Sequence, residues 1–171
     1  MSEPYIRQTF RNRCEILTSQ GVQKLSIPVD KKSTQSGTIK DAKIDYAENW
    51  QRQHWRSFQA SYNNSPYFLY YKDELQKFYE KRYTFLVEFN AEILRFILDK
   101  MRMKNEKLKM KNVAHAHSND VQLHSSFFIL HSSFLPYQQV FGENFVPNLS
   151  SLDLLFNCGP ESKHYLLTAN H

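Results

Sequence analysis

The chain has 171 residues, the length of one domain with a buried core, and its 15% aromatic content excludes a largely disordered protein. The net charge of +5 lies within residues 100–111, which hold six basic residues and one acidic residue, and this excludes a surface that is basic throughout. No apolar run approaches the roughly 20 residues that cross a bilayer, and the first residues lack the apolar stretch of a secretory signal. We therefore expect a cytoplasmic protein with free thiols at Cys14 and Cys158.

Residues 7–29 are expected to form β-strands. Residues 14–17 (CEIL) and 22–29 flank a Ser-Gln-Gly turn, a pattern that predicts a β-hairpin. Pro28 is typical of a strand end or an edge strand, because proline cannot donate to the ladder. After a polar loop, residues 39–44 are expected to form one more short strand.

The middle of the sequence has helical periodicity. Bulky residues recur at helical spacing over residues 50–62 and predict one face turned toward a core. Ser65 is expected to cap a second helix, with Pro66 in its first turn. Helical sequence then continues to about residue 110, with a break expected near Glu80. Its apolar face consists of Phe85, Leu86, Phe89, Ile93, Leu94, Phe96, Ile97 and Met101.

Residues 112–136 differ in composition from the rest. Three seven-residue units begin at His117, His124 and His131, and we interpret the segment as a low-complexity insert, since solenoid repeats are longer. Histidines seven apart lie about 10 Å apart along a helix and on opposite faces of a strand. Neither geometry brings them to one ion, so no metal site is expected.

The C-terminal part is expected to hold one short helix. Residues 152–156 (LDLLF) follow two candidate N-caps, Asn148 and Ser150, and precede Gly159, which suits a helix C-terminus. Together with the N-terminal strands, the pattern predicts a mixed α/β (α+β) fold in which a hairpin sheet packs against long helices.

The triplet Arg11-Asn12-Arg13 is a candidate site for an anion. On a strand, Arg11 and Arg13 point the same way, and two planar guanidinium groups can grip a phosphate or a carboxylate. Arginines that are solvated or ion-paired are the more common interpretation of such a triplet.

His54 and Asp153 are the candidate catalytic residues. Histidine titrates near neutral pH and can act as a general base, although a histidine at the core edge with one hydrogen bond is more common. Asp153 is either catalytic or an exposed residue on an amphipathic turn. The sequence contains no glycine-rich phosphate loop, nucleophile elbow or zinc motif, so it leaves the cofactor unknown.

The basic run at 100–111 has three interpretations. The most common is the solvated end of a long helix, where cations suit the helix dipole. Interleaved methionine and leucine residues also fit peripheral contact with an anionic membrane. Binding to nucleic acid is the third and least favoured interpretation.

Several strings together resemble the WbqC-like protein family. The resemblance covers roughly residues 5–105 and 137–165. The matching strings are residues 8–14 (QTFRNRC), 25–29 (LSIPV), 60–68 (ASYNNSPYF) with the tyrosine, tryptophan and histidine positions before them, Phe89-Asn90, 137–141 (YQQVF) and 145–162 (FVPNLSSLDLLFNCGPES).

The resemblance implies a transferase-like role in the biosynthesis of bacterial surface polysaccharide such as O-antigen. It implies a nucleotide-linked or lipid-linked sugar as substrate, and transfer of an aminoacyl group such as glycine is one candidate reaction. The residues that we expect to line such a site are Arg11, Asn12, Arg13, His54, Asn148, Ser150 and Asp153.

Two departures from the family pattern support an alternative. Family members usually open with a strand and a Gln-Pro-x-Tyr-x-Pro-like segment, which this sequence lacks, and the repeat replaces a polar segment. Residues 1–171 would then form a single but incomplete domain. In this alternative the chain is a non-catalytic or decaying fragment that binds a partner or an anionic membrane through its basic segment.

Overall fold

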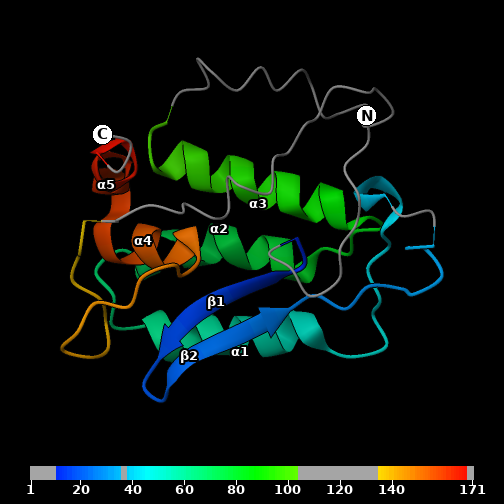
Figure 1. Ribbon diagram of the computed structural model, residues 1–171, viewed down its shortest axis with the longest axis horizontal. Helices are drawn as coiled ribbons and strands as arrows, with labels where there is room; N and C mark the ends of the chain where they lie inside the picture. Colours follow the sequence, from blue (N-terminus) through cyan, green and yellow to red (C-terminus); the bar gives the residue numbers. More distant parts are fainter. Residues whose placement is uncertain (1–10, 36–37, 104–134, 169–171) are drawn as a thin grey trace.

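The computed structural model describes residues 11–35, 38–103 and 135–168. Within them a two-stranded antiparallel sheet packs against α-helices (Figure 1). The predicted mixed α+β class, a hairpin sheet beside long helices, is confirmed.

The hairpin consists of β1 (Arg13–Thr18) and β2 (Gly21–Ser26). The register pairs Arg13 with Ser26 at the open end and Thr18 with Gly21 at the turn. Gly21 has a φ of 104°, a conformation that glycine adopts without steric cost. The predicted hairpin is therefore confirmed. β1 extends one residue beyond the expected range 14–17 at each end, whereas β2 ends at Ser26, earlier than the expected residue 29.

Groups outside the ladder satisfy three backbone atoms of the hairpin. The Leu17 N–H donates to the Tyr62 hydroxyl at 3.4 Å, and the Ser150 N–H donates to the Glu15 carbonyl at 2.7 Å. On β2, the Ser26 carbonyl bonds to Nε2 of His54 at 3.1 Å. These bonds protect parts of a two-stranded sheet that would otherwise offer unpaired edges.

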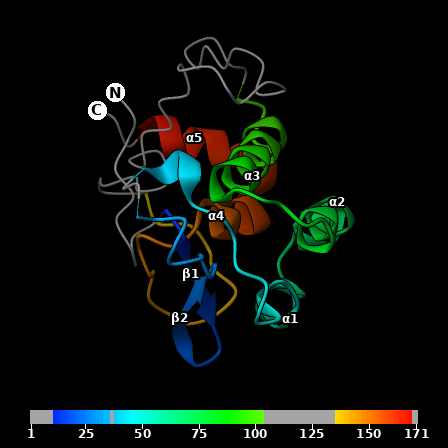
Figure 2. The ribbon, with the colours of Figure 1, turned by 90° about the vertical axis from the view of Figure 1, so that its right-hand side faces the viewer.

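Three helices form the body of the fold: α1 (Trp50–Tyr62), α2 (Phe68–Glu80) and α3 (Leu86–Lys100). Figure 2 shows α1 beside the hairpin, α2 beyond α1 on the side away from the hairpin, and α3 above them, next to α4. Aromatic rings fill the space between them, as in the edge-on contacts of Trp50 with Phe89 at 5.6 Å and of Phe58 with Tyr79 at 5.7 Å. The predicted apolar faces and the break near Glu80 are confirmed.

The expected strand at residues 39–44 is wrong. Residues Ile39–Asp41 form a 3-10 turn, η1, closed by a bond from the Ala42 N–H to the Ile39 carbonyl. Only single bridges follow this turn, because two successive residues pair with different segments, Lys43 with Phe85 and Ile44 with Val29. A regular strand would pair with one neighbour along its length.

The expected cap of α2 is also wrong. Ser65 donates its hydroxyl to the Tyr62 carbonyl at 2.8 Å, so it closes the end of α1. Helix α2 begins at Phe68, with Tyr67 at its N-cap and no side-chain capping bond. Pro66 therefore lies in the turn between the two helices and not in the first turn of α2.

Helix α3 ends at Lys100, well before residue 110. Arg102 has a φ of 53°, and the Met103 N–H bonds back to the Leu98 carbonyl at 2.9 Å. A left-handed residue with such a bond terminates a helix. The interpretation of the basic run as a helix end thus holds only for Lys100, and its residues from 104 onward lie outside the described residues.

The C-terminal part forms α4 (Ser151–Cys158), the 3-10 turn η4 (Gly159–Glu161) and α5 (Ser162–Thr168). Of the two predicted caps, Ser150 is the one used: its side chain accepts a bond from the Leu152 N–H. Gly159 ends α4 with φ 54° and ψ −133°, as predicted for a C-terminal glycine.

Replacing Gly159 should destabilise the fold strongly. A β-carbon there would lie 2.5 Å from the Tyr67 ring, and the backbone conformation is one that other residues avoid. We expect Gly159→Ala to lower the free energy of unfolding by about 3 kcal/mol or more. Gly21→Ala, where nothing lies within 4 Å, is the matched control and should cost about 1–2 kcal/mol from backbone strain alone. Urea denaturation measures both, and equal losses would show that the Tyr67 contact is unimportant.

Candidate functional site

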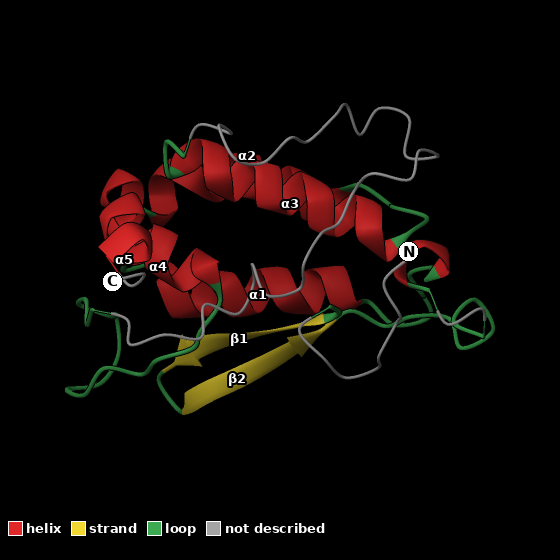
Figure 3. Ribbon diagram, turned by 45° about the horizontal axis from the view of Figure 1, so that its top comes forward, coloured by secondary structure: helices red, strands yellow, loops and turns green. Residues whose placement is uncertain are grey.

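A segment without helix or strand, residues 135–150, loops out at one side of the molecule and leads into α4 (Figure 3). We call it the strap. Gln139 closes a loop within it, since its side chain accepts from the Val146 N–H at 2.9 Å and donates to the Val146 carbonyl at 3.0 Å. The Tyr137 ring packs against Phe145 at 5.1 Å and against Tyr165 of α5 at 5.7 Å. The strap is thus held by defined side-chain contacts.

The strap meets the rest of the fold at a buried carboxylate. Asp153, on α4, is 0% exposed. Its Oδ1 accepts a hydrogen bond from the Tyr62 hydroxyl at 2.7 Å, and its Oδ2 accepts one from the Tyr137 hydroxyl at 2.6 Å. The Gln139 amide adds a third bond to Oδ2 at 3.2 Å. A buried carboxylate needs such donors, because an unsatisfied charge in the interior is costly.

Two routes join α4 to the hairpin, and one of them passes through this carboxylate. One is direct, because Ser150 at the start of α4 donates its N–H to Glu15 on β1. The other runs from Asp153 through Tyr62, whose hydroxyl also accepts the Leu17 N–H. The first turn of α4 is therefore fixed against β1 at two alternate residues of that strand.

The electrostatics of the cluster follow from its burial. Loss of solvent raises the pKa of Asp153, and the hydrogen bonds from Tyr137, Tyr62 and Gln139 act in the opposite direction. Burial, followed by the charge of Asp153, raises the pKa of both Tyr62 and Tyr137. Both phenols therefore stay protonated at neutral pH and serve as donors.

The structure places the predicted C-terminal residues in different surroundings. Asp153 is fully buried, so the interpretation of it as an exposed residue on an amphipathic turn is wrong. Asn148 is exposed and adopts a φ of 62°, three residues before α4. Ser150 is half-buried and caps α4. Of these three predicted residues, Asn148 and Ser150 therefore reach the surface and Asp153 does not. Ser150 lies beside β1, since its N–H donates to the Glu15 carbonyl.

The three residues of the predicted anion site have three different roles. Arg13, in β1, donates from Nε to the Ser26 hydroxyl at 3.2 Å and forms no ion pair with a carboxylate in the part of the chain that the structure describes. Asn12 donates to the Ile27 carbonyl at 3.1 Å and thereby extends the hairpin pairing. Arg11 lies in the turn before β1, where its carbonyl accepts from the Asn90 side chain at 2.8 Å. Arg13 alone thus lies on the strand.

His54 occupies the place expected for a histidine at the core edge. It is 5% exposed, lies edge-on to Trp50 at 5.1 Å, and makes one hydrogen bond, to Ser26. Because the acceptor is a carbonyl, Nε2 carries the proton. Burial lowers the pKa of His54 to about 4, so the ring is neutral at physiological pH. His54 lies on α1 and bonds to the edge of the hairpin, and this contact favours a structural role over that of a general base.

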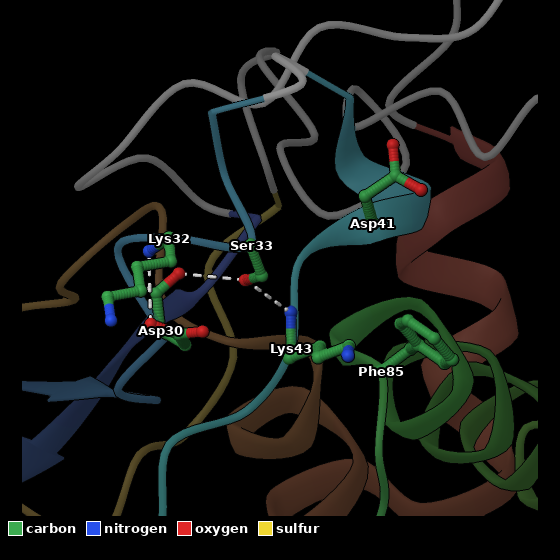
Figure 4. Close-up of a pocket in the computed structure, with 6 residues that line it drawn as sticks. All are labelled: Asp30, Lys32, Ser33, Asp41, Lys43 and Phe85. Atoms are coloured by element: carbon green, nitrogen blue, oxygen red, sulfur yellow. Dashed lines mark hydrogen bonds between the residues drawn. The ribbon is translucent and has the colours of Figure 1, made fainter.

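A separate pocket of about 460 Å³ opens between residues 30–43 and the start of α3 (Figure 4). Its wall is built by Ser33, whose hydroxyl donates to the Asp30 carbonyl at 2.7 Å and accepts from the Lys43 N–H at 2.9 Å. The Lys43 side chain extends toward the Phe85 ring, with Nζ 6.0 Å from its centre, whereas the Asp41 carboxylate points away from them. None of the residues predicted for the site lines this pocket.

Sequence reasoning missed Tyr62, Tyr137 and Gln139 as partners of Asp153. Tyr62 was recognised only as part of an apolar helix face, which is correct for its ring but not for its hydroxyl. An acid inside an apolar helix such as LDLLF is a signal that a buried donor is required, yet the sequence does not say where in the chain that donor lies.

The described residues contain no cluster of three or more histidine, cysteine, aspartate or glutamate side chains suited to a metal ion. The repeat histidines His117, His124 and His131 lie outside the described residues. Both cysteines are free, and burial raises the pKa of Cys14 to about 12 and that of Cys158 to about 11. Among the described helices, none is long and apolar enough to cross a membrane.

The chain belongs to the WbqC-like protein family, whose model matches residues 2–126 and 122–165. It is also similar to an uncharacterized protein of Mycobacterium tuberculosis, Rv1507c, with 33% identity over 94 residues. That alignment covers 54% of this chain and 40% of the relative, so the chain spans less than half of the relative's length. No solved structure matches the chain.

Removing the Asp153 carboxylate should destabilise the protein. Asp153→Ala leaves the Tyr62 and Tyr137 hydroxyls without their acceptor, and we expect a loss of about 3 kcal/mol in the free energy of unfolding. Asp73→Ala, at an exposed acid on α2, is the control and should change stability by less than about 0.5 kcal/mol. Denaturant unfolding at neutral pH measures both values. A loss at Asp153 no larger than that at Asp73 would contradict the assigned role.

His54 should make stability depend on pH in mild acid. Its pKa is about 4 in the folded protein and about 6.5 when unfolded, so the unfolded chain binds the proton more tightly. The stabilisation is complete above about pH 6.5 and is lost as the pH falls toward about 4, by about 3 kcal/mol.

The comparison that isolates this effect is with His54→Gln, which cannot titrate. The difference in unfolding free energy between wild type and this variant should shrink or reverse between about pH 6.5 and about pH 4. A difference that stays constant over this range would show that His54 is not buried in the neutral form.

Proposed function

We propose that the chain is a transferase-like protein that acts on an activated sugar, nucleotide-linked or lipid-linked, in the biosynthesis of bacterial surface polysaccharide such as O-antigen. Transfer of an aminoacyl group such as glycine is the candidate reaction. Membership of the WbqC-like family supports the class of protein, and the arrangement of polar side chains around β1 supports the location of the site.

The observation that carries the proposal is the bond between Ser150 and Glu15. At 2.7 Å it joins two segments that are more than 130 residues apart in the sequence. It brings the exposed Asn148 and the half-buried Ser150 beside the strand that starts at Arg13. This bond supports a shared site, because it fixes Ser150 to the residue that lies two positions after Arg13 on β1.

Arg13 supplies the group that would recognise the anionic part of the substrate. Its Nε bonds to a serine hydroxyl, and the described carboxylates do not neutralise it. Glu15 and Lys24, two positions along the hairpin, already pair with each other at 3.6 Å. The guanidinium is thus available for a bidentate bond to a phosphate or diphosphate, the group common to nucleotide-linked and lipid-linked sugars.

Asp153 contributes to this site by fixing the position of other residues and not by contacting the substrate. Since the carboxylate is buried and holds three hydrogen bonds, it cannot reach a substrate at the surface in this arrangement. It fixes the first turn of α4, and with it the Asn148–Ser150 segment, relative to β1. In this proposal Asp153 is therefore a positioning residue, and the burial of His54 and its bond to Ser26 support a structural role for that residue as well.

Nucleotide sugars should stabilise the protein through the two arginines. A panel of nucleoside diphosphate sugars is added to the purified chain, and the melting temperature is followed by circular dichroism. A binder at 100 times its dissociation constant raises the unfolding free energy by about 2.7 kcal/mol, which is several degrees for a domain of this size. The Arg11→Ala/Arg13→Ala variant should lose most of this shift.

Arg56→Ala is the matched control, because Arg56 is an exposed arginine on α1 away from the strap. It should keep the full ligand-induced shift. Equal shifts in the wild type and the double variant would remove the two arginines from the site. An absence of any shift across the panel would contradict the proposed substrate class.

A further inference from the structure

The pocket at the start of α3 has walls that are fixed by main-chain pairing (Figure 4). The Asp30 N–H donates to the Lys43 carbonyl at 2.9 Å, and the Leu86 N–H donates to the Ala42 carbonyl at 2.9 Å. The bridge between Lys43 and Phe85 belongs to the same pairing. Three segments of the chain are thus held together around a cavity of about 460 Å³, a volume within the roughly 300–1,000 Å³ of small-molecule sites.

Two lysines supply the positive charge of this pocket. Figure 4 shows their side chains on either side of Ser33. Within the described residues, no carboxylate forms an ion pair with Lys32 or Lys43. The Lys43 ammonium lies 6.0 Å from the centre of the Phe85 ring, which shields one side of it from water. An ammonium group beside a wall of low polarity favours an anionic ligand, and lysine is a common partner of phosphate.

The two acids of the pocket differ in what they offer to a ligand. Asp41 accepts a hydrogen bond from the Thr38 hydroxyl, and Figure 4 shows its carboxylate pointing away from the Phe85 ring. Asp30 accepts the Lys32 N–H on Oδ1 at 3.0 Å, and its Oδ2 has no hydrogen-bond donor among the residues that the structure describes. Asp30 therefore keeps an acceptor that a hydroxyl group of a ligand can satisfy.

We propose that this pocket binds a phosphorylated sugar. The Lys43 ammonium binds the phosphate, Oδ2 of Asp30 accepts a sugar hydroxyl, and the Phe85 ring packs against the apolar face of the sugar or of an attached base. A simple anion would pair with Lys43 but would bring a like charge toward Asp30. A ligand that carries hydroxyl donors as well as a phosphate satisfies both side chains.

The inference does not rest on the proposed transfer reaction, because the pocket shares no residue with the surface around Arg13 and Ser150. Arg13→Ala should therefore leave the affinity for glucose 1-phosphate unchanged, although it removes the guanidinium on which the proposed substrate site depends. Loss of glucose 1-phosphate binding in Arg13→Ala would place the phosphate at β1 and would overturn the inference.

Isothermal titration calorimetry of the full chain with glucose 1-phosphate and uridine monophosphate tests the pocket. Glucose, inorganic phosphate and alanine are the comparison probes, since they carry a sugar, a phosphate and a zwitterion separately. We expect a phosphorylated sugar to bind at least about tenfold more tightly than any of these three. The order of the two phosphorylated probes shows whether Phe85 faces a sugar ring or a base. No binding of either one, or binding no tighter than that of phosphate or alanine, would overturn the proposal.

Lys43→Ala and Asp30→Asn separate the two halves of the site. Lys43→Ala should weaken glucose 1-phosphate binding at least about tenfold, because the phosphate loses its cation. Asp30→Asn keeps an oxygen for the Lys32 N–H and should also weaken glucose 1-phosphate binding. Inorganic phosphate should bind to Asp30→Asn no more weakly than to the wild type, since this change removes a negative charge.

Lys31→Ala is the matched control, because Lys31 is an exposed lysine of the same loop that does not line the pocket. It should bind glucose 1-phosphate as the wild type does, and both lysine variants should keep the wild-type melting temperature. Equal losses in Lys31→Ala and Lys43→Ala would show a general effect of charge and would contradict a site in the pocket. Unchanged affinity in Asp30→Asn would remove the sugar hydroxyl from the assignment.

Discussion

The hydrogen-bonded carboxylate of Asp153 is the interaction on which the arrangement of the C-terminal half depends. Tyr62 approaches it from α1 and Tyr137 from the strap, at 2.7 and 2.6 Å. The strap has no regular secondary structure, so its place in the fold rests on side-chain bonds of this kind. A buried charge that three donors satisfy specifies one arrangement, because any other leaves the carboxylate unpaired.

The hairpin depends on the same cluster for its outer contacts. A two-stranded sheet is marginal by itself, and here α1 covers one of its faces. Tyr62 and Ser150 satisfy backbone groups of β1, and His54 satisfies one of β2. The surface that we propose for substrate binding lies where the Ser150 contact meets β1, so its geometry depends on the buried cluster behind it.

Much of this architecture is predictable from local sequence. The hairpin follows from strand-forming residues around a glycine turn, and the helices follow from the spacing of Trp50, Phe58 and Tyr62 and of the apolar residues in α3. The predictions were wrong where one local sequence pattern is compatible with two different structures. Ser65 precedes a proline, as an N-cap does, but it bonds backward to Tyr62. The basic run continues past Lys100 without a helix-breaking residue, yet α3 ends there through a left-handed Arg102.

The site was less predictable, because its partners come together only in the folded chain. The sequence indicates Asp153 as a candidate catalytic acid, but nothing in it pairs this residue with two tyrosines that are 91 and 16 positions away. Its burial reverses the expectation of an exposed acid and favours a positioning role. The same holds for His54, which is neutral and bonded to the hairpin edge.

The most direct test of the Asp153 cluster is a double-mutant cycle with Tyr62→Phe and Tyr137→Phe, measured by denaturant unfolding. Each change removes one hydroxyl and keeps the ring, so packing is preserved. If both tyrosines bond one carboxylate, the two losses should be coupled by about 1 kcal/mol. If the losses add within about 0.3 kcal/mol, the tyrosines act independently, and the strap is not fixed through a shared carboxylate.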